Sequence, residues 1–148
     1  RRGLTQALGL MHMFSLAAAL FLASFPVHAV CLEERPSVAV EARSARSVVV
    51  GSVAAQHVIR DPSDPEGSLA TVYIFTVAET LVGEQPDSPI HVWSDNDSSR
   101  FSMDPSARYL LFLTIDEEGF WRVDNCGSSE EYDPQSKTLS LIGSLDEP

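Results

Sequence analysis

Five runs rich in β-branched and aromatic residues dominate the sequence after position 30, and segments rich in proline, glycine and aspartate separate them. Such runs favour strands, and the segments between them favour turns. Since no helical pattern alternates with the runs, the sequence predicts an all-β fold, either a sandwich or a barrel. The runs cover residues 47–60, 69–82, 90–93, 108–116 and 120–123.

The same runs predict a core, because successive side chains of a strand point to opposite faces. If the pairing register of strand 108–116 shifted by one residue, Leu110 would face the core in place of Leu111. We therefore expect one of these two leucines inside and the other outside. Residues 61–68 and 83–89 have the composition of turns, and the irregular segment 94–107 carries two further apolar side chains that we expect to be buried. The expected inward-facing residues are Val49, either Tyr73 or Ile74, Leu111, Leu113 and Val123, with Phe101 and Met103 as anchors of the irregular segment.

The end of the chain changes from strand to helix periodicity. Asp133 suits the N-cap of a helix and Pro134 its first position. Leu139, Ile142 and Leu145 would share one face of that helix. We therefore expect a short C-terminal helix that covers an open end of the sheet. Residues 38–42 predict a short lead-in, either extended or helical.

The first 29 residues have the three parts of a secretory signal peptide. Arg1 and Arg2 precede an apolar run over residues 8–25, and Val27 and Ala29 occupy positions −3 and −1 of a cut after Ala29. We expect residues 1–29 to be a signal peptide and residues 30–148 to be one periplasmic or secreted domain. The alternative is a membrane-anchoring helix, because about eighteen apolar residues come close to spanning a bilayer. The membrane is a partner only if the signal peptide stays uncleaved.

The charge of the chain excludes polyanionic partners. Ten Lys and Arg oppose 21 Asp and Glu, which gives a formal net charge of −11. Removal of Arg1 and Arg2 with the signal peptide deepens this charge to −13. Nucleic acids and anionic membranes bind basic surfaces, so we expect neither as a partner.

Two cysteines, Cys31 and Cys126, remain after removal of the signal peptide. An even pair in an exported chain predicts a disulfide, and the alternative is two separate buried thiols. A bond that closes a loop of this length stabilises a fold by up to about 4–5 kcal/mol in the chain-entropy model. The sequence contains no CxxC motif and no Cys/His cluster, so it supports neither a metal site nor a redox motif.

Several motifs occur in an order that resembles one exported family. They are the cysteine near the mature N-terminus, VVVGSV at 48–53, YIFTVAETLVG at 73–83, RYLLFL at 108–113 and VDNCGSS at 123–129. This order is similar to that of the bacterial relatives of the tissue inhibitors of metalloproteinases, which are netrin-like domains with an OB-fold. The resemblance covers about residues 31–129. It implies an all-β, five-stranded OB-like barrel, here with a short C-terminal helix and preceded by a signal peptide. One departure is the segment 98–101 (SSRF), where many members carry a further cysteine.

The resemblance also implies a function. It indicates an exported, non-catalytic protein-binding domain, and in its most specific form an inhibitor of a zinc metalloprotease. In that family the α-amine and carbonyl of an N-terminal cysteine chelate the catalytic zinc of the protease. Cys31 would take this role, and Val30, Cys31 and Leu32 would form the protease-contacting N-terminus, although a cut after Ala29 leaves Val30 in front. The alternative is a structural or accessory envelope protein without inhibitory activity.

Residues that could carry catalysis are sparse. His57 and His91 are the histidines outside the signal peptide, and no G-x-S-x-G motif is present. We therefore expect no enzymatic activity and no cofactor, and we expect His57 on the surface or rim of its strand. The segment 95–99 begins like a calcium loop, but Arg100 and Ser106 break the pattern, which favours an Asx-rich turn. Three large aromatic residues are candidates either for the core or for a binding platform. They are Trp93, Phe120 and Trp121.

Overall fold

The computed structural model describes residue 31, residues 35–98 and residues 100–146. The expected signal peptide and the expected contact residues Val30 and Leu32 lie outside the described residues. Within the described residues no helix is long and apolar enough to cross a bilayer.

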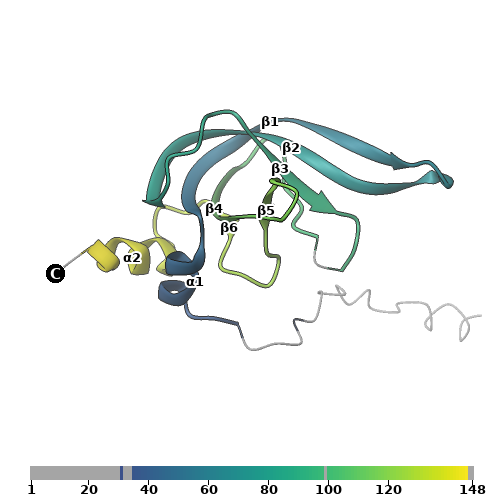
Figure 1. The fold of residues 1–148 in the computed structure, drawn as a ribbon. Helices are drawn as coiled ribbons and strands as arrows, with labels where there is room; N and C mark the ends of the chain where they lie inside the picture. The colour runs from purple at the N-terminus through teal and green to yellow at the C-terminus, as the bar shows by residue number, and fades with distance from the viewer. Residues whose placement is uncertain (1–30, 32–34, 99, 147–148) are drawn as a thin grey trace, which may run out of the picture.

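The described part of the chain forms one sheet of six strands that closes on itself (Figure 1). The strands follow the order β1-β2-β3-β5-β4-β6, and β1 also pairs with β4, which closes a five-stranded barrel. β3 and β5 run parallel, and the other described pairings are antiparallel. The predicted all-β, OB-like barrel is confirmed. The strands are β1 (Ser47–Asp61), β2 (Asp64–Gly83), β3 (Ile90–Asp95), β4 (Arg108–Ile115), β5 (Trp121–Val123) and β6 (Glu130–Glu131).

The predicted turn over residues 61–68 is wrong in its extent. β1 continues to Asp61 and β2 begins at Asp64, so a tight hairpin replaces the long turn. Asp61 stabilises the hairpin, because its Oδ1 accepts hydrogen bonds from the amide nitrogen and the hydroxyl of Ser63 at 2.8 and 2.6 Å. Prolines are tolerated here because this end of the sheet is an edge, where a missing N–H breaks no ladder bond. The two strands therefore project from the barrel as a long ribbon (Figure 1).

The barrel interior holds the main core. Val49, Leu111 and Leu113 are fully buried, and Tyr73 is buried whereas Ile74 is only partly so. Val123 packs against this core while partly exposed. The segment 94–107 closes the core as predicted, since Met103 is buried, Phe101 packs against it, and the amide of Met103 donates to the Tyr73 hydroxyl at 3.2 Å. The buried members are Val49, Val53, Tyr73, Phe75, Ile90, Val92, Met103, Tyr109, Leu111 and Leu113.

A second core lies on the outer face of β1 and β4. Leu110 is as buried as Leu111, so the expectation that only one of them faces the core is wrong. The reason is that α1 (Val38–Ser44) and α2 (Lys137–Gly143) cover this face of the barrel (Figure 1). The buried members of this cluster are Ala42, Val48, Val50, Leu110, Phe112 and Ile142.

The helices differ in detail from the predicted ones. The lead-in is helical, and α2 begins at Lys137 with Ser136 as its N-cap, three residues later than predicted. The Ser136 hydroxyl accepts from the amide of Leu139 at 3.1 Å. Asp133 instead forms a turn before the helix, because its carboxylate accepts from the amide of Gln135 at 2.8 Å. The 3₁₀ helix η1 (Ser144–Asp146) follows α2.

Burial on both faces of β4 makes a direct prediction. Leu110→Ala and Leu111→Ala should each lower the free energy of unfolding by about 2–5 kcal/mol, because each leaves a cavity in a different core. Ile115→Ala is the matched control on the same strand, since Ile115 is 44% exposed. Urea denaturation of the three variants measures the difference. A Leu110 variant as stable as the Ile115 variant would contradict the second core.

Candidate functional site

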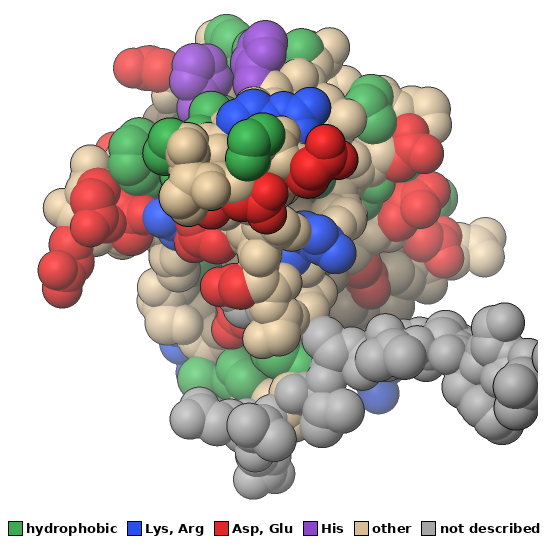
Figure 2. Space-filling model, turned by 90° about the vertical axis from the view of Figure 1, so that its right-hand side faces the viewer, with side chains coloured by type: hydrophobic (Ala, Val, Ile, Leu, Met, Phe, Trp, Pro, Cys, Tyr) green, Lys and Arg blue, Asp and Glu red, His purple; other side chains and the backbone are tan. Residues whose placement is uncertain are grey.

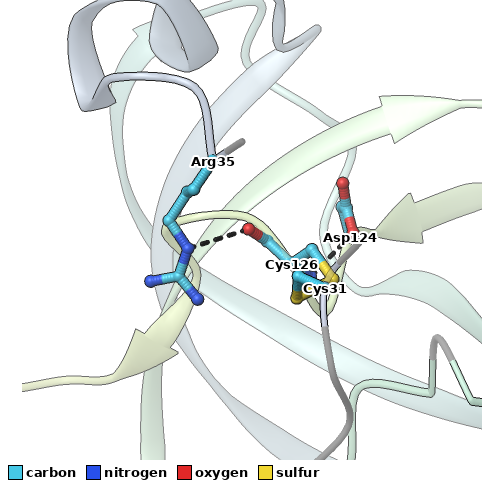
Figure 3. The surroundings of a disulfide bond; sticks show 4 residues. All are labelled: Cys31, Arg35, Asp124 and Cys126. Atoms are coloured by element: carbon cyan, nitrogen blue, oxygen red, sulfur yellow. Dashed lines mark hydrogen bonds between the residues drawn. A yellow bond between two sulfur atoms is a disulfide. The ribbon is translucent and has the colours of Figure 1, made fainter. Parts of the chain in front are cut away.

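The two cysteines form the predicted disulfide. The Cys31 and Cys126 sulfurs lie 2.05 Å apart and the Cα atoms 5.7 Å apart (Figure 3). Cys126 belongs to the loop that follows β5, whereas Cys31 lies seven positions before the first residue of α1. The bond therefore attaches Cys31 to one end of the barrel.

Polar contacts hold the same loop from both sides. Arg35 donates from Nε to the Cys126 carbonyl at 2.9 Å, and Asp124 accepts from the Cys126 amide at 2.8 Å (Figure 3). Glu41 reaches the loop from the first turn of α1, where its two carboxylate oxygens accept from the amide of Ser128 at 3.0 and 2.8 Å. We call the disulfide with these contacts the N-terminal clamp. It attaches Cys31, Arg35 and Glu41 of α1 to the loop after β5 by separate contacts.

The Glu41 contact can be tested by removal. Glu41→Ala should lower the free energy of unfolding by about 1–3 kcal/mol, because it leaves the amide of Ser128 without its charged acceptor. Glu117→Ala is the control, since Glu117 is exposed in the β4–β5 turn and carries the same charge. Urea denaturation with the disulfide intact gives the comparison. Equal stability of the two variants would show that Glu41 contributes nothing to the clamp.

A second cluster lies on the outer face of β3 and β5. The ring centroids of Trp93 and Phe120 lie 4.9 Å apart with 25° between their planes, and the Arg122 guanidinium carbon lies 5.7 Å from the Trp93 centroid. Trp93 points outward because its neighbour Val92 faces the core. Of the three candidate aromatic residues, Trp121 packs partly against the core and Phe120 is 40% exposed. Trp93, Phe120 and Arg122 are called the aromatic platform below.

Two carboxylates hold the aromatic platform in place. Asp95 accepts from the Trp93 indole nitrogen at 2.8 Å and from Arg122 Nη1 at 2.7 Å. Asp116 accepts from Arg122 Nε at 2.5 Å and from the amide of Phe120 at 2.8 Å. Burial alone raises the pKa of Asp116, but the hydrogen bonds from Arg122 and Phe120 together with the Arg122 charge outweigh it and lower this pKa below its usual value. Each member of the platform is thus fixed by a carboxylate contact or by stacking.

A hollow of about 250 Å³ lies beside the aromatic platform. Trp93, Asp95 and Arg122 line it, and Ser94, Thr114, Val123 and Asp124 complete its walls. A smaller hollow of about 160 Å³ near α1 shares Thr114 and Asp124 with it. Asp124 therefore belongs both to the wall of the larger hollow and to the N-terminal clamp, which places the two regions next to each other.

The remaining candidates lie elsewhere. His57 is exposed, as expected, and so is His91. They lie on the strands to either side of β2, and Figure 2 shows the two imidazoles at one edge of the molecule. In the segment predicted to be an Asx-rich turn, Asn96 accepts a hydrogen bond from Arg100 Nη1 at 2.7 Å. Asp95 instead accepts from Arg122 in the aromatic platform. Among the described residues, no group of three or more His, Cys, Asp or Glu side chains could hold a metal ion.

Comparison with known proteins assigns no family: no protein-family model matches the chain, and no curated protein matches it. Function must therefore be argued from the N-terminal clamp and the aromatic platform.

The pKa of Asp116 predicts an acid sensitivity. A carboxylate whose pKa is lowered by folding stabilises the fold above its unfolded pKa of about 3.9, and this stability is lost as the pH falls through the folded value. Asp116→Asn should therefore show a smaller loss of stability than the parent protein between pH 6 and pH 3. Urea midpoints at both pH values measure this. An equal loss in both proteins would mean that Asp116 does not contribute to the acid response.

Proposed function

We propose that this chain is an exported, non-catalytic protein-binding domain, which binds a partner protein through the end of the barrel that carries Cys31. The observation that carries the proposal is the N-terminal clamp, in which Cys31 is bonded to Cys126 and Arg35 contacts the same loop. A residue that is already attached to a rigid barrel loses less entropy when a partner binds it, so the bond of Cys31 to the barrel favours affinity. The disulfide also favours an oxidising, extracytoplasmic compartment.

The surface charge supports a protein rather than a nucleic acid as the partner. Acidic side chains are scattered over the face in Figure 2, in keeping with the formal charge of −11 for the whole chain. A surface of this sign repels phosphate backbones and anionic headgroups. It remains compatible with neutral or basic protein surfaces.

The most specific form of the proposal is inhibition of a zinc metalloprotease. The chain resembles the bacterial relatives of the tissue inhibitors of metalloproteinases, in which an N-terminal cysteine chelates the protease zinc through its α-amine and carbonyl. The clamp would hold Cys31 rigid for this purpose. Chelation requires Cys31 to be the first residue, whereas cleavage after Ala29 would leave Val30 in front of it. The mature N-terminus therefore decides between a chelating inhibitor and a protein that binds without inhibiting.

Three forms of the protein test this proposal against a panel of zinc endopeptidases. One form begins at Cys31, one begins at Val30, and one begins at Cys31 with its α-amine acetylated. We expect inhibition by the free Cys31 form and at least a tenfold weaker effect from the other two, because both lack a free amine at the chelating position. The acetylated form is the matched control, since it changes the amine and leaves every side chain in place.

The other outcomes are equally informative. Inhibition by none of the three forms would favour a structural or accessory envelope protein. Equal inhibition by all three would contradict chelation and leave a contact surface on the barrel as the inhibitory element. Hydrolysis of any panel substrate by the chain itself would overturn its assignment as a non-enzyme.

A further inference from the structure

The hollow beside the aromatic platform combines an aromatic wall with polar groups of several kinds. Trp93 supplies the aromatic wall, Arg122 supplies N–H donors, and Asp95, Asp124 and Thr114 supply oxygens. Its volume of about 250 Å³ is below the range of about 300–1,000 Å³ that is typical for drug-sized ligands. The hollow therefore suits a single small polar unit.

The polar groups of the hollow retain capacity for a ligand. Arg122 carries five N–H donors, and two of them serve Asp95 and Asp116 within the described part of the chain. Asp124 accepts from the Cys126 amide with Oδ1, and Oδ2 of the same carboxylate is a further acceptor. The Thr114 hydroxyl can both donate and accept. Donors and acceptors thus converge on one small volume.

The charges of the lining select against charged ligands. A cation would be repelled by the Arg122 guanidinium, which already forms ion pairs with the carboxylates of Asp95 and Asp116. An anion would meet the carboxylates of Asp95 and Asp124 in a chain with a formal charge of −11. A neutral ligand with adjacent hydroxyl groups can donate to a carboxylate and accept from a guanidinium at the same time. Such hydroxyls on a ring with apolar C–H faces are the chemistry of a sugar.

The place of the platform in the barrel agrees with this chemistry. Five-stranded barrels of this kind bind oligonucleotides or oligosaccharides over strands 2 and 3 and the loops between strands 1 and 2 and between strands 4 and 5. Trp93 lies on β3, and Phe120 and Asp116 belong to the connection between β4 and β5. The acidic charge disfavours an oligonucleotide on this surface.

We propose that the aromatic platform and its hollow bind a neutral oligosaccharide. One sugar ring occupies the hollow beside Trp93 and pairs with Arg122 and Asp124, and the next ring lies over Phe120, which is 40% exposed. Asp95 and Asp116 fix the platform before the ligand arrives, so little side-chain entropy is lost on binding. This proposal does not depend on the role of the N-terminus.

Titration of the exported protein with three neutral tetrasaccharides tests the proposal: cellotetraose, maltotetraose and tetra-N-acetylchitotetraose. Both tryptophans of the chain lie near the site, Trp93 on the platform and Trp121 in the same short stretch of β5 as Arg122, so tryptophan fluorescence and calorimetry are the readouts. We expect saturable binding of at least one sugar, with equal affinity for forms beginning at Val30 and at Cys31. Phe120→Ala should weaken binding at least fivefold, and Arg122→Lys at least tenfold, because lysine lacks the planar donor fork.

The matched control is Leu141→Ala, since Leu141 is also 40% exposed but lies on α2. It should leave the affinity unchanged, and circular dichroism of every variant checks that the barrel is intact. Absence of saturable binding for all three sugars would overturn the proposal. Sugar binding that neither Phe120→Ala nor Arg122→Lys weakens would place the ligand outside the hollow and the aromatic platform. Saturable binding of tetralysine or of heparin, but of none of the three sugars, would contradict the proposal, because the hollow would then bind a charged ligand.

Discussion

The pairing between β1 and β4 is the constraint on which the rest of this structure depends. It runs from Ser47 opposite Leu113 to Ser52 opposite Arg108, and it closes the barrel. Because side chains alternate along both strands, closure places Leu111 inside the barrel and Leu110 beneath the helices. On the other side of β1, Gly51 allows the close approach of β2, since a Cβ at this position would collide with the Thr76 carbonyl oxygen and the Phe75 ring.

Closure of the barrel also determines which of its outer faces is left for the candidate binding groups. The helices occupy the outer face of β1 and β4, so the outer face of β3 and β5 carries Trp93 and Arg122. The loop after β5 then leads from the aromatic platform to Cys126 within a few residues. Asp124 contacts both regions. The attachment of Cys31 and the preorganised polar hollow thus lie at the same end of the barrel. One proposal concerns Cys31, and the other concerns the hollow.

Local patterns were sufficient to predict an all-β fold, five of the six described strands and the disulfide, whereas the choice of a barrel over a sandwich came from the family resemblance. The β-branched runs fixed the strand positions, and the anchors Phe101 and Met103 stood out as apolar residues in a polar segment. The burial of Leu110 was not predictable, because it depends on helices that pack from both ends of the chain. The sequence predicted only part of the aromatic platform. Its aromatic residues were candidates, but their link through Asp95, Asp116 and Arg122 requires the parallel pairing of β3 with β5, which no local pattern encodes.

The central claim is that Cys31 is covalently bonded to the loop after β5. Peptide mapping of the exported protein without reduction, after alkylation of free thiols, tests this claim directly. The account predicts one cross-linked pair of peptides that contains Cys31 and Cys126, with neither cysteine alkylated before reduction. Recovery of both cysteines in alkylated form would contradict it, because Cys31 would then lack its covalent bond to the barrel.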